Sequence, residues 1–258
     1  MAFETIEVDA SGAVGTIALN RPEKLNPLSV LTLRELAEAA RSFDARPEVK
    51  VVVVCGRGRA FSAGADVSVF AAGAPSVAEQ RAAADAGRLM AEAVERMRAV
   101  TVARIQGHCV GGGVVLAAAC DLRVAAEGAR FSIPEVALGI PLAWGGVQRL
   151  VREIGTAMTR ELVLTCRPFD AAEARSLGFV NRVVGDAELE AATAELVEVL
   201  VSRSALTLEA TKRAVAAASE ELVSTAGAWS DADALLSALA DPDSRAVAAA
   251  YLAGLARG

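Results

Sequence analysis

The chain has 258 residues, 53% of them hydrophobic, which allows one large domain or a domain with an appendage. A net charge of −6 without a basic block argues against nucleic acid as a partner. No apolar run reaches the roughly 18 residues of a membrane span. The N-terminal residues are acidic and have no apolar stretch, so we expect no secretory signal there. The four cysteines lack CxxC spacing, so we expect free thiols, no metal site and a cytoplasmic protein.

The first half of the chain alternates β-rich runs with amphipathic segments. Residues 49–56 contain four consecutive valines, which is typical of a strand buried on both faces. We expect helices at 29–45 and 77–99, and strands at 12–20, 49–56, 102–107, 122–126 and 129–133, the last two as a strand pair. This alternation predicts an α/β fold with right-handed crossovers.

The last quarter of the chain has a different character. From about residue 186 it is alanine-rich and helical in periodicity, with interruptions near Gly227 and at 241–243. Asp243 or Ser244 is expected to cap the final helix. We therefore divide the chain into a core, 1–185, and a helical region, 186–258, that packs on this core or on another subunit.

Two loops offer backbone N–H groups to a negatively charged oxygen. Gly111–Gly113 follow a predicted strand and open an apolar helix, so their N–H groups also gain the helix dipole. Residues 60–66, AFSAGAD, follow a buried strand, and their small side chains let a ligand approach the backbone. Taken separately, the first loop is equally compatible with close helix–strand packing, and the second is more typical of an ordinary turn.

Glu135 is a single acidic residue in an apolar segment. A carboxylate in such surroundings is a candidate base with a raised pKa. With the two loops, it predicts removal of a proton beside a carbonyl and stabilisation of the resulting enolate. A solvated glutamate at a helix start, or a structural ion-pair partner, is the alternative interpretation of this residue.

Six segments, in order and spacing, resemble the enoyl-CoA hydratase/isomerase (crotonase) family: RPEKLNPLS, AFSAGAD, GHCVGGG, CDLRVA, FSIPEVALGI and GGVQRL. The resemblance covers about residues 14–182 closely and the helical tail loosely. It implies a crotonase-like spiral of ββα units whose C-terminal helices build homotrimers, often paired into hexamers. It also implies acyl-CoA thioesters as substrates, with no separate cofactor.

The resemblance also assigns residues to the site. It implies that Ala63 and Gly112 donate N–H groups to the thioester oxygen, as an oxyanion hole. Further substrate or CoA contacts are implied at Lys24, Leu25, Ala63, Gly64, Ala65, Asp66, Gly111, Gly112, Val115, Pro134 and Leu142.

Two positions depart from the family pattern. Hydratases that resemble this chain use two glutamates, and here the second is Glu135 while the first is Val115. An aspartate position of dienoyl-CoA isomerases falls on Ala143. What remains resembles a single-glutamate isomerase, in which one group takes a proton from C2 and returns it to C4. We therefore predict an enoyl-CoA isomerase with Glu135 as its acid and base.

Two alternatives stay open. One is a hydratase or another crotonase-type lyase that recruits a second acid from the segment 67–90, with Asp85 or Glu79 as candidates. The other is a catalytically poor acyl-CoA binding protein, which the absence of acids at Val115 and Ala143 favours.

Several other residues are candidates for the site, but we expect most of them to have structural functions. His108 is the single histidine, and we expect it to pack or to form a backbone hydrogen bond. Asp66 and Asp121 are expected to bond to nearby backbone or arginine. Leu142 and Trp144 replace smaller residues of the family pattern, so they either narrow the acyl pocket or serve packing alone.

Overall fold

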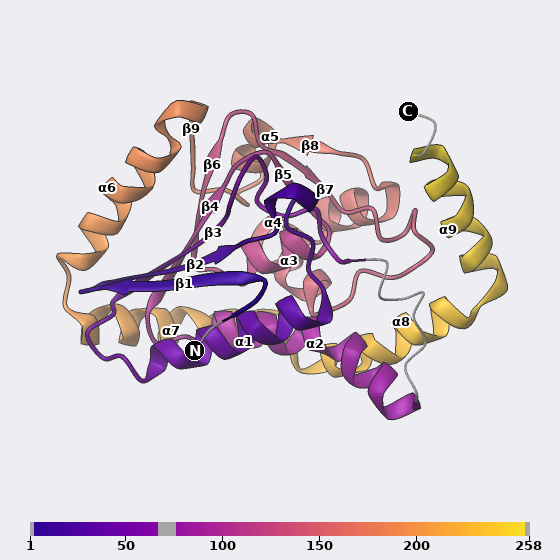
Figure 1. Cartoon of the computed structure of the whole chain (residues 1–258), viewed down its shortest axis with the longest axis horizontal. Helices are drawn as coiled ribbons and strands as arrows, with labels where there is room; N and C mark the ends of the chain where they lie inside the picture. The colour runs from indigo at the N-terminus through magenta and orange to yellow at the C-terminus, as the bar shows by residue number, and fades with distance from the viewer. Residues whose placement is uncertain (1–2, 67–75, 256–258) are drawn as a thin grey trace.

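A computed structural model describes residues 3–66 and 76–255, where helices surround two β-sheets (Figure 1). The larger sheet has the order β1-β2-β3-β4-β6-β9; β1 and β2 pair antiparallel, and the other neighbours pair parallel. The smaller sheet has the order β5-β7-β8. The strands are β1 (Ile6–Ser11), β2 (Val14–Leu19), β3 (Val51–Gly56), β4 (Val100–Ile105), β5 (His108–Val110), β6 (Leu122–Ala126), β7 (Arg130–Ser132), β8 (Phe169–Asp170) and β9 (Arg182–Val184).

The helices follow the strands of the first half and then make up most of the tail. The tail helices α8 and α9 stand at one end of the molecule (Figure 1). The α-helices are α1 (Val30–Asp44), α2 (Val77–Glu95), α3 (Gly112–Ala118), α4 (Gly146–Thr165), α5 (Ala171–Ser176), α6 (Leu189–Val201), α7 (Ala205–Leu222), α8 (Asp231–Ala240) and α9 (Pro242–Leu255). In the ranges that the structure describes, no helix is long and apolar enough to cross a membrane.

The expected α/β fold and most expected elements are confirmed, with two corrections. Residues 122–126 and 130–132 are strands, but they do not pair with each other. A turn at Glu127 and Gly128 carries the chain from one sheet into the other, so β6 pairs with β4 while β7 pairs with β5.

The cap of the last helix is neither Asp243 nor Ser244. Instead, Asp241 Oδ2 accepts from the Ser244 N–H at 2.8 Å, and a proline begins the helix.

The central strand β3 is buried on both faces, as its valines predict. Val52 and Val54 pack into the main core with α1, α2 and α3. Val51 and Val53 face a second cluster, which α6 completes with Leu189, Leu196 and Val197. The tail helix α6 therefore covers one face of the larger sheet.

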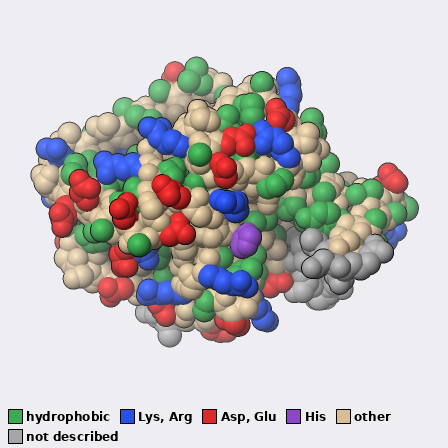
Figure 2. Space-filling view, turned by 90° about the horizontal axis from the view of Figure 1, so that it is seen from above, with side chains coloured by type: hydrophobic (Ala, Val, Ile, Leu, Met, Phe, Trp, Pro, Cys, Tyr) green, Lys and Arg blue, Asp and Glu red, His purple; other side chains and the backbone are tan. Residues whose placement is uncertain are grey.

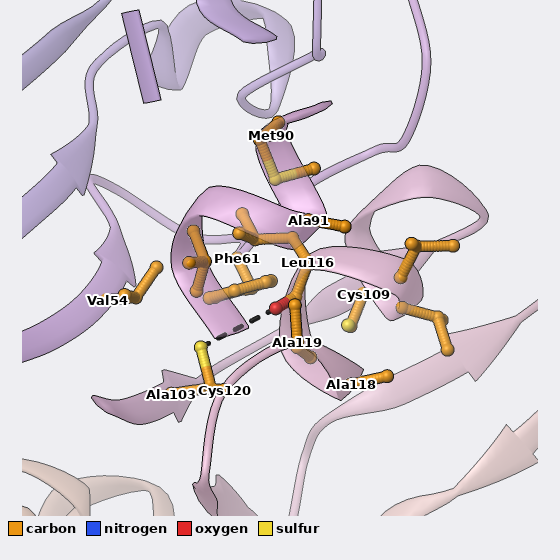
Figure 3. Packing of buried hydrophobic residues seen from close by; sticks show 14 of the residues in the cluster. Val54, Phe61, Met90, Ala91, Ala103, Cys109, Leu116, Ala118, Ala119 and Cys120 are labelled. Atoms are coloured by element: carbon orange, nitrogen blue, oxygen red, sulfur yellow. Dashed lines mark hydrogen bonds between the residues drawn. The ribbon is translucent and has the colours of Figure 1, made fainter. Parts of the chain in front are cut away.

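Helix α3 lies entirely in the main core, and this fixes the glycine turn that opens it. All seven of its residues are buried, and Leu116 packs among Phe61, Met90 and Cys109 (Figure 3). The Cys120 Sγ bonds to the Leu116 carbonyl at 3.5 Å. Burial raises the pKa of the Cys120 thiol to about 12, so it remains protonated and unreactive at neutral pH.

Two arginines of α4 bind a glutamate of α2, and one of them also reaches the tail. Arg149, which is 2% exposed, and Arg152 share the two oxygens of Glu95 at 2.6 and 2.9 Å. Arg152 also pairs with Glu220 of α7. Arg152 therefore links α7 to α2 through two carboxylates that remain partly exposed to solvent.

Candidate active site

A cavity of about 240 Å³ lies where the two donor loops, the segment after β7 and the helices α8 and α9 meet. Its walls are mostly apolar. From the expected site residues it collects Ala63, Gly64, Ala65, Gly111, Gly112, Val115, Pro134, Glu135 and Leu142. The lining extends from Ala63 to Leu252, so the structure brings together segments that lie far apart in the sequence.

The two donor loops are in direct contact. Gly64 has a φ of +89°, and a Cβ built on it would lie 2.7 Å from the Val110 carbonyl oxygen and 3.6 Å from the Gly112 nitrogen. Gly111 has a φ of +48°, which a residue with a side chain rarely adopts. In the part of the chain that the structure describes, the Gly112 N–H has no hydrogen-bond acceptor and lines the cavity.

The structure corrects the expected donor Ala63. Its N–H donates to the Leu25 carbonyl at 2.8 Å and is therefore already used. The Leu28 N–H donates to the Gly64 carbonyl at 2.8 Å, and Leu28 in turn accepts from the Asp66 N–H at 3.0 Å. Because both bonds flank Ala65, its own N–H faces away from Leu28. Among the described residues the Ala65 N–H has no acceptor, and Ala65 lines the cavity.

Glu135 is buried in the cavity wall, 9% exposed. Its Oε2 has no hydrogen-bond partner among the residues described. Loss of water around the carboxylate is the main cause that raises the pKa of Glu135 to about 7, partly offset by a bond to its own backbone. The turn that carries it is held by the Ile140 N–H, which donates to the Glu135 carbonyl at 3.0 Å. The solvated and ion-paired interpretations of Glu135 do not fit these surroundings.

The candidates for a second acid on α2 are wrong. Both Asp85 oxygens bond to the Arg88 guanidinium at 2.6 Å. Glu79 is exposed and accepts from the Ser76 hydroxyl at 2.8 Å. Neither lines the cavity. Residues 67–75 of the expected segment lie outside the described part, and their sequence contains no acidic residue. Of the described acidic residues, Glu135 alone lines the cavity.

The rest of the cavity wall is mostly apolar. Val115 and Ala143 are both buried there. Leu142 and Trp144 line the same cavity, as the narrowing interpretation requires. Tyr251 of α9 also lines it, and the sequence analysis did not find this residue. The single tyrosine of the chain lies more than a hundred residues from Glu135, and its periodic, alanine-rich surroundings give no motif.

Three residues implied by the family motifs lie outside the cavity lining. Lys24 is exposed at the end of the 3-10 helix Pro22–Lys24, and Leu25 follows it with a φ of +62°. Asp66 forms an ion pair with Arg21 at 3.3 Å, as expected of a structural residue.

The remaining polar residues have structural partners. Asp121 accepts from the Thr101 N–H at 2.7 Å and forms an ion pair with Lys212 at 2.7 Å. His108 is exposed (Figure 2) and does not line the cavity, while its main-chain carbonyl accepts from the Ser62 N–H at 2.9 Å. Among the described residues, no group of three or more His, Cys, Asp or Glu side chains could hold a metal ion.

Comparison with known proteins agrees with this arrangement. The family model "Enoyl-CoA hydratase/isomerase" matches residues 9–253. A protein of Mycobacterium tuberculosis described as a probable enoyl-CoA hydratase is 41% identical over 187 residues, covering 71% of this chain and 70% of the relative. A short-chain-enoyl-CoA hydratase of Clostridium acetobutylicum is 33% identical over 216 residues, covering 83% and 82%. The crystal structure of an enoyl-CoA hydratase from Mycobacterium avium subsp. paratuberculosis superposes with a TM-score of 0.88 at 29% identity, covering 96% of this chain and 99% of that one.

Proposed function

We propose a single-carboxylate isomerase reaction for this chain, which belongs to the enoyl-CoA hydratase/isomerase (crotonase) family. The observation that carries the proposal is the isolation of Glu135. It is the one described acidic side chain in the cavity, its Oε2 is unpartnered, and the position of a second family glutamate is Val115. Burial raises the pKa of Glu135 to about 7, which suits a group that must both accept and donate a proton near neutral pH.

The reaction moves the double bond of a 3-enoyl-CoA by one carbon. The Glu135 carboxylate takes a proton from C2, and the electron pair moves into the thioester to give a dienolate. The same carboxylic acid then delivers the proton to C4, so a double bond forms between C2 and C3. Each turnover regenerates the carboxylate, and no second acid is required.

The negative charge that develops on the thioester oxygen must be stabilised by hydrogen-bond donors near the N-terminus of α3. We assign this function to the N–H groups of Ala65 and Gly112, because both line the cavity without an acceptor among the described residues. Preorganised donors stabilise the developing oxyanion more than the neutral carbonyl, and one such donor typically contributes about 10²–10³ in rate. Lys24, Leu25 and Asp66 are proposed to contact the CoA moiety nearer the surface.

Hydration is the second candidate, because the similar proteins named above carry the name of hydratases. Syn addition of water needs a group that orients the water besides Glu135. We assign this role to Tyr251, whose side chain lines the cavity. If this chain hydrates 2-enoyl-CoA, Tyr251→Phe should lower hydration strongly while the 3-enoyl to 2-enoyl shift is retained.

The decisive experiment incubates the purified protein with 3-enoyl-CoA and with 2-enoyl-CoA and measures both products. Conversion of 3-enoyl-CoA to 2-enoyl-CoA with little 3-hydroxyacyl-CoA supports the isomerase. Rapid formation of 3-hydroxyacyl-CoA from 2-enoyl-CoA would overturn it in favour of the hydratase. Binding of acyl-CoA without either reaction would identify a catalytically poor binding protein.

We further propose that residues 1–185 form the catalytic core and that residues 186–258 build a homotrimer or a dimer of trimers. No residue of helix α7 is fully buried within the described chain. Leu206 and Leu222 on this helix are 75% and 84% exposed. Another subunit is the common way to cover such apolar surface. The four free thiols support a reducing, cytoplasmic setting.

A further inference from the structure

Trp144 occupies an unusual position between the glycine turn and helix α2. Its indole is buried, and the Nε1–H donates to the Ala84 carbonyl at 3.1 Å. Its backbone has a φ of +65°, which is rare for a bulky residue and persists only when the surroundings hold it. The hydrogen bond and the packing together fix the ring in one place.

Two glycines make room for this ring. A Cβ built on Gly87 of α2 would lie 1.9 Å from Trp144 Cδ2, and one built on Gly112 would lie 2.3 Å from Cζ3. Glycine inside a helix lowers its stability by about 1 kcal/mol relative to alanine. A glycine is nevertheless needed at position 87, because a larger residue would collide with the indole. Because the same ring packs on Gly112, it lies beside the N–H that we assign to the thioester oxygen.

We propose that Trp144 closes the acyl pocket on its α2 side and restricts the enzyme to short acyl chains. This inference rests on the proposed acyl-CoA function. The cavity of about 240 Å³ lies below the roughly 300–1,000 Å³ of typical small-molecule pockets. The indole fills the space between Gly87 of α2 and Gly112 of α3. The acyl carbons that follow the thioester therefore contact the ring and cannot extend between these two helices.

The test measures binding of unreactive saturated thioesters, so that it does not depend on which reaction the enzyme performs. Dissociation constants for butyryl-CoA and octanoyl-CoA are obtained by calorimetry for wild type, Trp144→Phe and Trp144→Ala. Wild type should bind butyryl-CoA more tightly. The ratio of octanoyl-CoA to butyryl-CoA affinity should rise about tenfold or more in Trp144→Ala, because the added methylenes become buried, with Trp144→Phe in between. Trp229→Ala, which removes a tryptophan that is 60% exposed, should leave the ratio unchanged.

A double-mutant cycle tests the same contact independently of binding. Gly87→Ala should destabilise wild type markedly, because its Cβ would meet the indole, and should be nearly neutral or stabilising in the Trp144→Ala background. Equal or tighter binding of octanoyl-CoA by wild type, or a Trp144→Ala ratio that does not move, overturns the assignment of Trp144 while leaving the acyl-CoA function intact. Failure of wild type to bind either thioester would instead overturn the proposed function, and this inference with it.

Discussion

The carboxylate of Glu135 lies against the α-carbon of Gly111. A Cβ built on Gly111 would fall 2.3 Å from Glu135 Oε1, so the position excludes any side chain. The next residue, Gly112, presents an N–H without an acceptor among the described residues. The glycine turn therefore serves two purposes: it makes room for the acid, and it places a donor beside it.

Replacement of the acid tests its assignment directly. Glu135→Gln should lower turnover by about a thousandfold or more, because the amide keeps the size of the side chain but cannot accept the C2 proton. Affinity for a saturated acyl-CoA should stay within a few-fold. The control is Glu127→Gln, the same change at an exposed site, which should keep wild-type turnover. More than a tenth of wild-type activity in Glu135→Gln would show that another group is the base.

The raised pKa of Glu135 predicts a specific dependence of stability on pH. Its pKa is about 7 in the folded protein against an ordinary value of 4.5, so between these pH values the folded state binds a proton that the unfolded state has lost. The free energy of unfolding of wild type, relative to Glu135→Gln, should be highest below about pH 4.5 and fall by roughly 3 kcal/mol as the pH rises through about 7. Urea unfolding of both proteins across this range measures the difference. A constant difference would show that Glu135 titrates normally.

Activity should follow the opposite trend. The reaction starts from the carboxylate of the free enzyme, so kcat/KM for the double-bond shift should rise with pH and level off above about 7, the pKa of Glu135.

The backbone donors can be distinguished by replacing single amides with esters. An ester at the N–H of Ala65 removes one proposed oxyanion donor and should lower kcat by about 10²–10³. An ester at Ala63 removes instead the bond to the Leu25 carbonyl, so it should lower stability by about 1 kcal/mol and change kcat little. A larger loss of kcat at Ala63 than at Ala65 would restore Ala63 as the donor.

Val115→Glu tests whether the missing second acid limits hydration. The new carboxylate would enter a buried wall of the cavity, and we expect hydration of 2-enoyl-CoA to increase. Burying it should cost on the order of a few kcal/mol of stability. Val115→Gln has the same bulk without the charge and controls for folding. A folded Val115→Glu protein with no gain in hydration would show that Val115 is not the limiting feature.

The assembly prediction concerns the surface of α7. Light scattering at micromolar concentration should give a trimer or hexamer of the 26.5 kDa chain. Leu206→Glu with Leu222→Glu should shift it toward monomer, because charges would enter the proposed contact. Val77→Glu, on the equally exposed start of α2, is the control.

Deleting residues 242–258 should dissociate or aggregate the protein and lower activity, because it also removes Tyr251 and Leu252 from the cavity. A monomer mass for the intact chain would contradict this prediction.

Local patterns in the sequence determined much of the protein. The four valines of β3 predicted burial on both faces, and the structure divides them between two clusters. The motif order gave the family, and the lone acid in apolar sequence gave Glu135. These features depend on residues that are close in the sequence, so they can be predicted without knowing the tertiary structure.

The tertiary structure alone decided features that depend on partners distant in the sequence. Whether Ala63 or Ala65 has a free N–H is set by pairing with residues 25–28, some forty positions earlier. Asp85 was lost as a candidate acid because the packing of α2 leaves it out of the cavity lining. Tyr251 reaches the cavity because α9 folds back beside it. Sequence periodicity identifies the face of an element, but a free hydrogen-bonding group is known only when every competing partner has been placed.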